Sequence, residues 1–188
     1  YTTAPASAAR RSAQSALWHI TQSFVRLLAP ITAFTAEEVW QVLGGTADDS
    51  VMFQVWHELP KPAGEGDLLA KWALIRAARA DVTKALEAQR EAGKIGSALQ
   101  AAVEIRCGGE KYAALDSLGD DLKFVLICSS AALLRDETEQ VIATPLDYAK
   151  CERCWHVRDD VGSDAGHPGL CGRCVSNLYG EGEARSCA

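Results

Sequence analysis

The stretch that decides the fold of the C-terminal end reads Cys151-Glu-Arg-Cys154, then sixteen further residues, then Cys171-Gly-Arg-Cys174. Each Cys-x2-Cys pair bends the backbone into a knuckle on which two sulfurs converge, and two knuckles supply the four thiolates that Zn²⁺ prefers in a closed structural site. Residues 148–188 hold few large apolar side chains, so a domain of this size needs the metal for much of its stability. The spacing therefore predicts one structural zinc ion bound by these four cysteines.

Other uses of the cysteines are weaker matches to the sequence. Two symmetric pairs argue against a single redox dithiol, the spacing differs from the compact ferredoxin run, and four thiolates leave no open position for a catalytic water. His156 and His167 lie between the pairs and could replace one cysteine as a ligand. Cys107, Cys128 and Cys187 are isolated, and we expect them to be packed or exposed thiols in a reducing compartment.

Side chains around the knuckles have the chemistry of an RNA-binding surface. An aromatic ring beside guanidinium groups can stack on unpaired bases and bind phosphates, which is how single-stranded RNA is commonly recognised. The candidate RNA contacts are Arg153, Trp155, His156 and Arg173. For Trp155 the alternative is a place in the core of so small a module.

The middle of the chain predicts a small α+β unit. Alternating apolar residues from Leu99 to Arg106 indicate a strand with one buried face, and residues 111–118 favour a short helix. The apolar run 124–128 is typical of a buried strand, and residues 140–148 contain a third extended segment.

A long helix is expected to begin with Asp67 as its N-cap and to end at Gly93. One face is apolar, and beside it four basic side chains fall within about 60 degrees of arc on a helical wheel. These are candidate phosphate contacts, although long basic stems also cover the edge of a core with their heads in water. The stripe consists of Arg76, Arg79, Arg90 and Lys94.

Two helices joined by a tight bend are predicted for the N-terminal region. Apolar residues recur at three- and four-residue steps from Leu17 to Ile31, with Pro30 ending the first helix near Ala29. A capping box formed by Thr35 and Glu38 is expected to begin the second helix. Residues 51–56 look extended, and the Pro- and Gly-rich run 60–66 indicates a linker.

Composition limits the classes of function. The chain has 188 residues, 48% of them hydrophobic and 23% charged, which disfavours disorder, and no apolar run is long enough for a membrane span. We expect a cytoplasmic protein with no membrane partner and, because the first residue is not Met, a piece of a longer polypeptide. The net charge of −6 excludes binding of nucleic acid through a uniformly positive field, so such contacts must be local.

Three runs near the C-terminus resemble the end of bacterial isoleucyl-tRNA synthetases: Cys151-Glu-Arg-Cys-Trp-His156, Cys171-Gly-Arg-Cys-Val-Ser-Asn177 and Gly180-Glu-Gly-Glu-Ala-Arg185. Residues 28–40 resemble the helical anticodon-binding domain of the class I synthetases for Ile, Val, Leu and Met. Residues 84–96 and 118–127 resemble the junction region of the isoleucine family. Cys187 departs from the Phe expected before the final Ala.

The resemblance implies an α+β arrangement of three parts: the end of a helical anticodon-binding domain (1–60), a long helix with a small α+β junction unit (61–147) and a zinc-binding domain (148–188). It implies that this portion contacts the anticodon stem-loop of tRNA(Ile) and the rest of the synthetase. ATP-dependent aminoacylation and editing would belong to the missing part, because the ATP-binding signatures are absent here, and no catalytic residue is assigned.

Two rival functions stay open. A formamidopyrimidine-type DNA glycosylase carries a very similar four-cysteine finger, although its catalytic Pro-Glu N-terminus is missing from this chain. A free-standing zinc ribbon that binds nucleic acid or other proteins is the second alternative.

Overall fold

The computed structural model describes residues 2–46 and 48–185, in two compact units. One unit consists of Arg11–Ala63 and is called the helical unit below. The other combines the first ten residues with the chain from Gly64 onward. Among the described residues, none of the helices combines the length and apolar character needed to cross a bilayer.

The helical unit is built on α1 (Ala8–Leu28), whose first residues belong to the other unit, and on α2 (Ala33–Val42). Helix α1 ends two residues before Pro30, as predicted, because proline cannot continue a helix. A small core packs Val25 of α1 against Trp40 of α2. The Trp40 indole N–H donates to the carbonyl oxygen of Asp49 at 2.8 Å, which fixes the loop after α2.

Two expectations for this unit were wrong, the capping box and the extended chain after it. Helix α2 begins at Ala33, so Thr35 lies inside its first turn and forms no capping box. Glu37, rather than Glu38, bonds the following loop, because its carboxylate accepts from Ser50 Oγ at 2.8 Å and Val51 N at 3.1 Å. Residues 51–53 form a short 3₁₀ helix instead of extended chain.

The apolar stripe of α1 is largely exposed. Ile20 and Phe24 keep 49% and 57% of their surface accessible, whereas Gln22 and Val25 are the buried residues of this helix. The period of the stripe therefore indicated a helix correctly. It did not indicate which side chains of α1 are buried within the helical unit.

The other unit begins with α3 (Glu65–Glu91), which starts two residues before Asp67. Gly64 precedes it with φ of 72°, a left-handed conformation that glycine adopts without steric cost. The buried residues of α3 are Ile75, Ala78, Val82 and Leu86.

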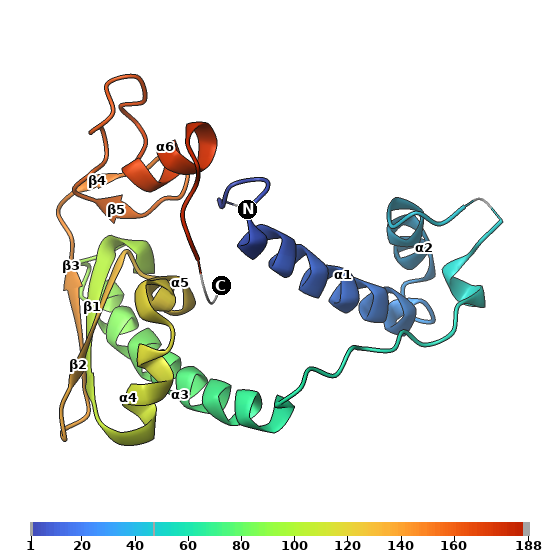
Figure 1. Cartoon of the computed structure of the whole chain (residues 1–188), viewed down its shortest axis with the longest axis horizontal. Helices are drawn as coiled ribbons and strands as arrows, with labels where there is room; N and C mark the ends of the chain where they lie inside the picture. Colours follow the sequence, from blue (N-terminus) through green and yellow to red (C-terminus); the bar gives the residue numbers. More distant parts are fainter. Residues whose placement is uncertain (1, 47, 186–188) are drawn as a thin grey trace. The chain divides into compact units, whose positions relative to one another are not determined.

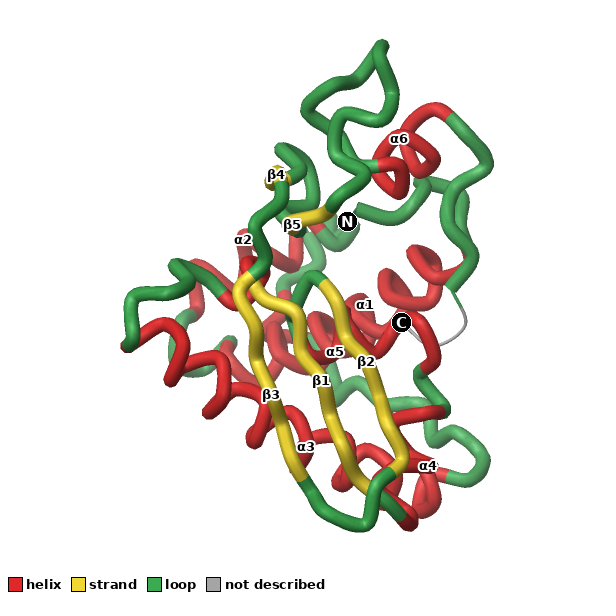
Figure 2. The backbone as a smooth tube through the Cα atoms, turned by 90° about the vertical axis from the view of Figure 1, so that its left-hand side faces the viewer, coloured by secondary structure: helices red, strands yellow, loops and turns green. Residues whose placement is uncertain are grey.

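Helix α3 covers one face of a three-stranded sheet formed by β1 (Ala101–Cys107), β2 (Ser130–Arg135) and β3 (Gln140–Pro145), in the order β2-β1-β3. Strand β1 runs parallel to β2 and antiparallel to β3. Helices α4 (Gly109–Asp116) and α5 (Leu122–Leu126) form the crossover between the parallel strands. Figure 2 shows the strands in front and these helices behind them.

The predicted alternation of β1 is confirmed, since Ala101, Val103, Ile105 and Cys107 are buried and the residues between them are only partly so. The prediction of a strand at 124–128 was wrong: this run lies in and just after α5, and the strand begins at Ser130. A short apolar run has no period that separates a buried strand from one buried helical turn.

The isolated cysteines that the structure describes are packed thiols. Cys107 and Cys128 are both fully buried, and burial raises the pKa of the Cys128 thiol to about 12. Cys187 lies outside the described residues.

Residues 148–185, called the four-cysteine module below, follow the end of β3. They contain β4 (Ala149–Lys150), β5 (Val157–Arg158) and α6 (Gly172–Tyr179), and β4 pairs antiparallel with β5. Figure 1 shows this hairpin above the end of the sheet. The predicted α+β fold class is confirmed, whereas the three predicted domain limits stay predictions.

One buried hydroxyl connects the four-cysteine module to the sheet. Ser129 Oγ donates to the Leu99 carbonyl oxygen at 2.5 Å and accepts from Val157 N of β5 at 2.8 Å. Only 4% of Ser129 is exposed, so both partners depend on this hydroxyl rather than on water.

We expect Ser129→Ala to lower the free energy of unfolding by about 2 kcal/mol, because it leaves the buried Val157 N–H and the part-buried Leu99 carbonyl without their partner. Urea denaturation measures the change, with Ser130→Ala, an exposed neighbour, as the control. Equal stability of the two variants would contradict a linking role for Ser129.

Candidate metal centre and nucleic-acid interface

The four predicted metal ligands come together. The Sγ atoms of Cys151, Cys154, Cys171 and Cys174 all lie within 4.8 Å of one another, and three of these residues are fully buried. Cys154 Sγ and Cys171 Sγ are 3.7 Å apart. Zn–S bonds of about 2.3 Å in a tetrahedron place sulfurs about 3.8 Å apart, so the arrangement fits a zinc ion.

Backbone hydrogen bonds shape both knuckles. In the first, Trp155 N donates to the Cys151 carbonyl oxygen and Cys151 N donates to that of His156, both at 2.9 Å. In the second, Cys171 precedes α6, and its N–H donates to Cys151 Sγ at 3.4 Å. These bonds bring the two pairs face to face, although sixteen residues separate them.

Two arginines lie beside the sulfurs and compensate their charge. Arg153 Nη1 donates to Cys174 Sγ at 3.7 Å, and Arg173 hydrogen-bonds Cys154. The hydrogen bond from the Cys171 thiol, assisted by Arg173, lowers the pKa of Cys154 well below its usual range. Four thiolates around Zn²⁺ have a net charge of −2, so two adjacent guanidinium groups match the site in sign and number.

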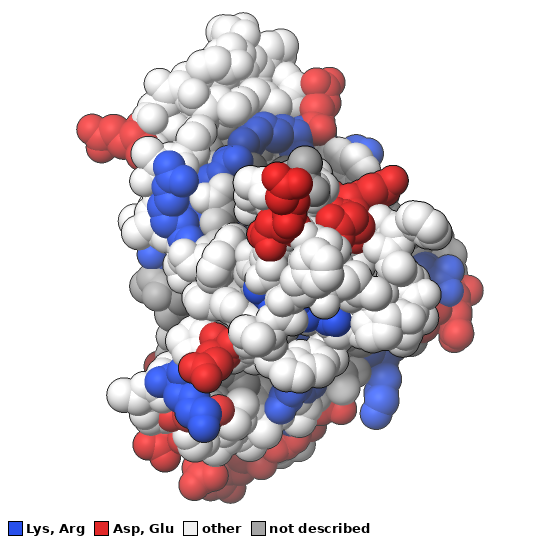
Figure 3. All heavy atoms as spheres, turned by 90° about the vertical axis from the view of Figure 1, so that its right-hand side faces the viewer, with Lys and Arg blue, Asp and Glu red and all other residues white. Residues whose placement is uncertain are grey.

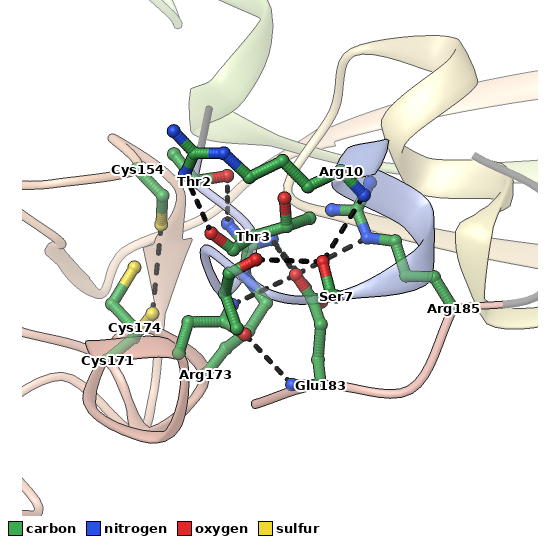
Figure 4. Close-up of polar contacts among 12 residues, drawn as sticks. Thr2, Thr3, Ser7, Arg10, Cys154, Cys171, Arg173, Cys174, Glu183 and Arg185 are labelled. Carbon is green, nitrogen blue, oxygen red and sulfur yellow. Dashed lines mark hydrogen bonds and ion pairs between the residues drawn. The ribbon is translucent and has the colours of Figure 1, made fainter. Parts of the chain in front are cut away.

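The same arginines also make contacts away from the sulfurs, and Figure 4 shows those of Arg173. Arg153 Nη1 donates to the Thr2 carbonyl oxygen at 2.7 Å, and Arg173 Nη1 donates to Glu183 Oε1 at 3.0 Å. The Arg173 side chain is only 10% exposed, and its guanidinium lies 4.9 Å from the centre of the Phe124 ring. Both arginines therefore join segments of the chain, a role that sequence reasoning missed.

Glu183 is the centre of this polar cluster. Its carboxylate also accepts from Asn177 Nδ2 at 3.0 Å and pairs with Arg185 Nε at 3.4 Å, while its own N–H donates to Asn177 Oδ1 at 2.9 Å. The Arg185 guanidinium lies 3.7 Å from the centre of the Phe124 ring. The tail 183–185 is thereby attached to both α5 and α6.

The two histidines lie outside the group of sulfur ligands. His156 is only 8% exposed, its ring packs edge-on against Phe124, and burial lowers its pKa. His167 stacks on Tyr179 with ring centres 4.1 Å apart. Among the described residues, the cluster of possible metal ligands contains the cysteines alone.

Trp155 is placed differently from the other candidate contacts. It is 62% exposed, so the alternative interpretation of a core residue is wrong. Its φ of 67° is left-handed, a conformation that is unfavourable for a bulky side chain. Lys150 Nζ lies 5.6 Å from the ring centre, within the range of a cation–π interaction.

Three residues of the basic stripe lie on α3, a different element from the knuckles, and the fourth, Lys94, follows the end of this helix at Glu91. Arg76, Arg79, Arg90 and Lys94 are all exposed, and Arg90 Nε donates to Glu87 Oε2 at 2.9 Å. Figure 3 shows one face of the molecule, on which basic and acidic groups are interspersed among broad uncharged areas. This face offers no continuous basic field to a phosphate backbone.

Comparisons with known proteins agree with this geometry. Residues 1–105 match the family model of the anticodon-binding domain of tRNA ligase, and residues 150–177 match that of a zinc finger found in FPG and IleRS. The second match includes both Cys-x2-Cys pairs.

Similar curated proteins carry the name isoleucine–tRNA ligase. The protein of Dechloromonas aromatica is 85% identical over the whole chain, that of Aromatoleum aromaticum 56% identical over 99% of it, and that of Azoarcus sp. 54% identical over 99%. The chain spans about a fifth of the length of each of these relatives. It belongs to the anticodon-binding domain family of the tRNA ligases and carries a zinc finger of the kind found in FPG and IleRS.

Proposed function

We propose that this chain is a tRNA-binding part of an isoleucine–tRNA ligase, and that it contacts the anticodon stem-loop of tRNA(Ile). The observation that supports this best is the combination, on one chain, of the anticodon-binding family match and the IleRS-type finger. ATP-dependent aminoacylation and editing would belong to the rest of the ligase, with which this part would be joined. No residue of this chain is assigned to catalysis.

The proposed cofactor is one structural zinc ion, held by Cys151, Cys154, Cys171 and Cys174. Four thiolates fill a tetrahedral shell, so the metal would cross-link two distant segments and offer no position to a reacting water. The finger type alone does not identify the nucleic acid, because FPG shares it. The match over residues 1–105 favours tRNA over DNA and over a free-standing zinc ribbon.

Trp155 is the knuckle residue best suited to bind RNA. A left-handed conformation costs a non-glycine residue about 1–2 kcal/mol, and burial of the indole does not offset this cost because the ring is mostly exposed. The indole N–H donates to the Glu152 carbonyl oxygen at 3.2 Å, a local bond within the knuckle that leaves most of the ring exposed. An exposed ring beside the Lys150 ammonium is suited to stack on an unpaired base near a phosphate.

Arg153, Arg173 and His156 are weaker candidates for direct contact. Arg173 and His156 have little exposed surface, and both arginines are engaged by the sulfurs and by the chain itself. We propose that they support the RNA contacts by holding the knuckles in place. Arg76 and Arg79 on α3, and Lys94 just after its end, are exposed and could reach phosphates.

We expect strong chelation under reducing conditions to remove one zinc ion per chain and to unfold residues 148–185, because few apolar contacts replace the metal. Metal analysis and amide hydrogen exchange measure the two effects. Cys154→Ser is expected to lose the metal, whereas Cys128→Ser is the control that keeps it. A module that stays protected without metal contradicts the structural role.

Trp155→Ala is expected to weaken binding of the anticodon stem-loop about tenfold, since stacking on one base contributes about 1–3 kcal/mol. Trp155→Gly should weaken binding equally, while the free energy of unfolding stays within about 1 kcal/mol of the parent because the backbone strain is removed. Leu178→Ala, another exposed apolar residue of the module, is the control. If the free energy of unfolding falls together with the affinity for RNA, the role of Trp155 is structural.

The double variant Arg76→Gln/Arg79→Gln tests the stripe on α3. If both side chains neutralise phosphates, the slope of the logarithm of tRNA affinity against that of salt concentration should fall by about two. Lys71→Gln/Lys84→Gln changes the net charge equally on the same helix, outside the stripe, and should leave the slope unchanged. If both double variants show the same salt dependence of tRNA affinity, the residues of the stripe are ordinary solvated side chains.

A further inference from the structure

A cavity with a volume of about 500 Å³ lies where the sheet meets the β4–β5 hairpin. Its walls come from the first residues of β1 and β2, from Lys123 on α5, and from Tyr148 and Arg158 at the hairpin. The volume falls within the range in which proteins bind small organic groups, about 300–1,000 Å³. None of the candidate RNA contacts found from the sequence lines this cavity.

The walls hold a mixed set of charges and one exposed ring. Lys123 and Arg158 supply positive charge, while Asp120 and Asp159 supply carboxylates. A free phosphate would meet these two anions as well as the two cations, which disfavours a simple anion site. Tyr148 is 56% exposed, so its ring is free to stack.

The cavity is also preorganised. Ser129, a wall residue, cross-links Leu99 and Val157 through its hydroxyl, which holds the hairpin against the sheet. Arg158 is held by two bonds to Asp160, Nε to Oδ1 at 2.8 Å and Nη2 to Oδ2 at 3.1 Å. Fixed walls lower the entropic cost of ordering a ligand.

We propose that this cavity binds one unpaired nucleotide of the RNA, with the base against Tyr148 and its polar edge toward the wall carboxylates. A nucleobase fits such walls because it has an aromatic face and an edge with both donors and acceptors. Lys123 would then lie on the side of the sugar-phosphate backbone. The inference rests on the proposed function, since it names a second contact for the same RNA.

The test measures binding of the 188-residue chain to an anticodon stem-loop in which single loop positions carry 2-aminopurine. We expect Tyr148→Ala to weaken binding about tenfold and to abolish the fluorescence change at one loop position. Lys123→Gln should weaken binding less, and mainly at low salt. The control is Tyr179→Ala, because Tyr179 is an exposed tyrosine of the same module that lies outside the cavity wall.

Ser130→Gln provides a second variant that leaves Tyr148 intact, because it puts a longer uncharged side chain at the cavity wall. It should reproduce the loss of affinity and of the fluorescence change, with zinc content and thermal unfolding unchanged. If the parent and Tyr148→Ala bind the stem-loop equally while Trp155→Ala binds weakly, the cavity proposal is wrong and the proposed function stands. If the parent binds no RNA, both are wrong.

Discussion

The convergence of four thiol groups within 4.8 Å is the constraint on which the C-terminal part of this protein depends. A module with so few large apolar residues cannot be stable without a cross-link, and buried sulfur ligands concentrate negative charge. Arg153 and Arg173 lie beside the sulfurs and compensate this negative charge. The sequence had suggested both residues as RNA contacts. Because these two arginines are engaged by the sulfurs, they are less available for contact with a partner.

Polar cross-links, rather than a shared apolar core, attach the four-cysteine module to its surroundings. Ser129 joins the sheet to β5, and Glu183 joins α6 to the tail, while Phe124 lies within cation–π range of both Arg173 and Arg185. Such contacts are directional, so they fix orientation more strictly than apolar packing of the same size would. The proposed contact of the Trp155 ring with RNA would benefit from this fixed orientation.

An acidic chain can bind RNA when recognition is local. The two proposed base contacts, Trp155 and Tyr148, are exposed rings on one hairpin, with Lys150 and Lys123 nearby in the structure. Stacking needs no net positive field, and a few placed cations are sufficient to hold the backbone of a loop. On the face shown in Figure 3, the interspersed charges are compatible with this mode of binding and unsuited to electrostatic binding of a duplex over a broad area.

By itself, the sequence determined which four cysteines come together, the helices α1 and α3 and the alternating strand β1, because spacing and period are local properties of the chain. It misassigned the apolar run 124–128 as a strand and the start of α2 to a capping box at Thr35, since short runs and single caps depend on what packs against them. Only the tertiary structure decided that Arg173 is buried against Glu183, that Trp155 is exposed with a left-handed backbone, and that Tyr148 and Lys123 line one cavity. Those facts depend on how the folded chain places its side chains in three dimensions, and the pattern of apolar and polar residues does not encode which side chain meets which.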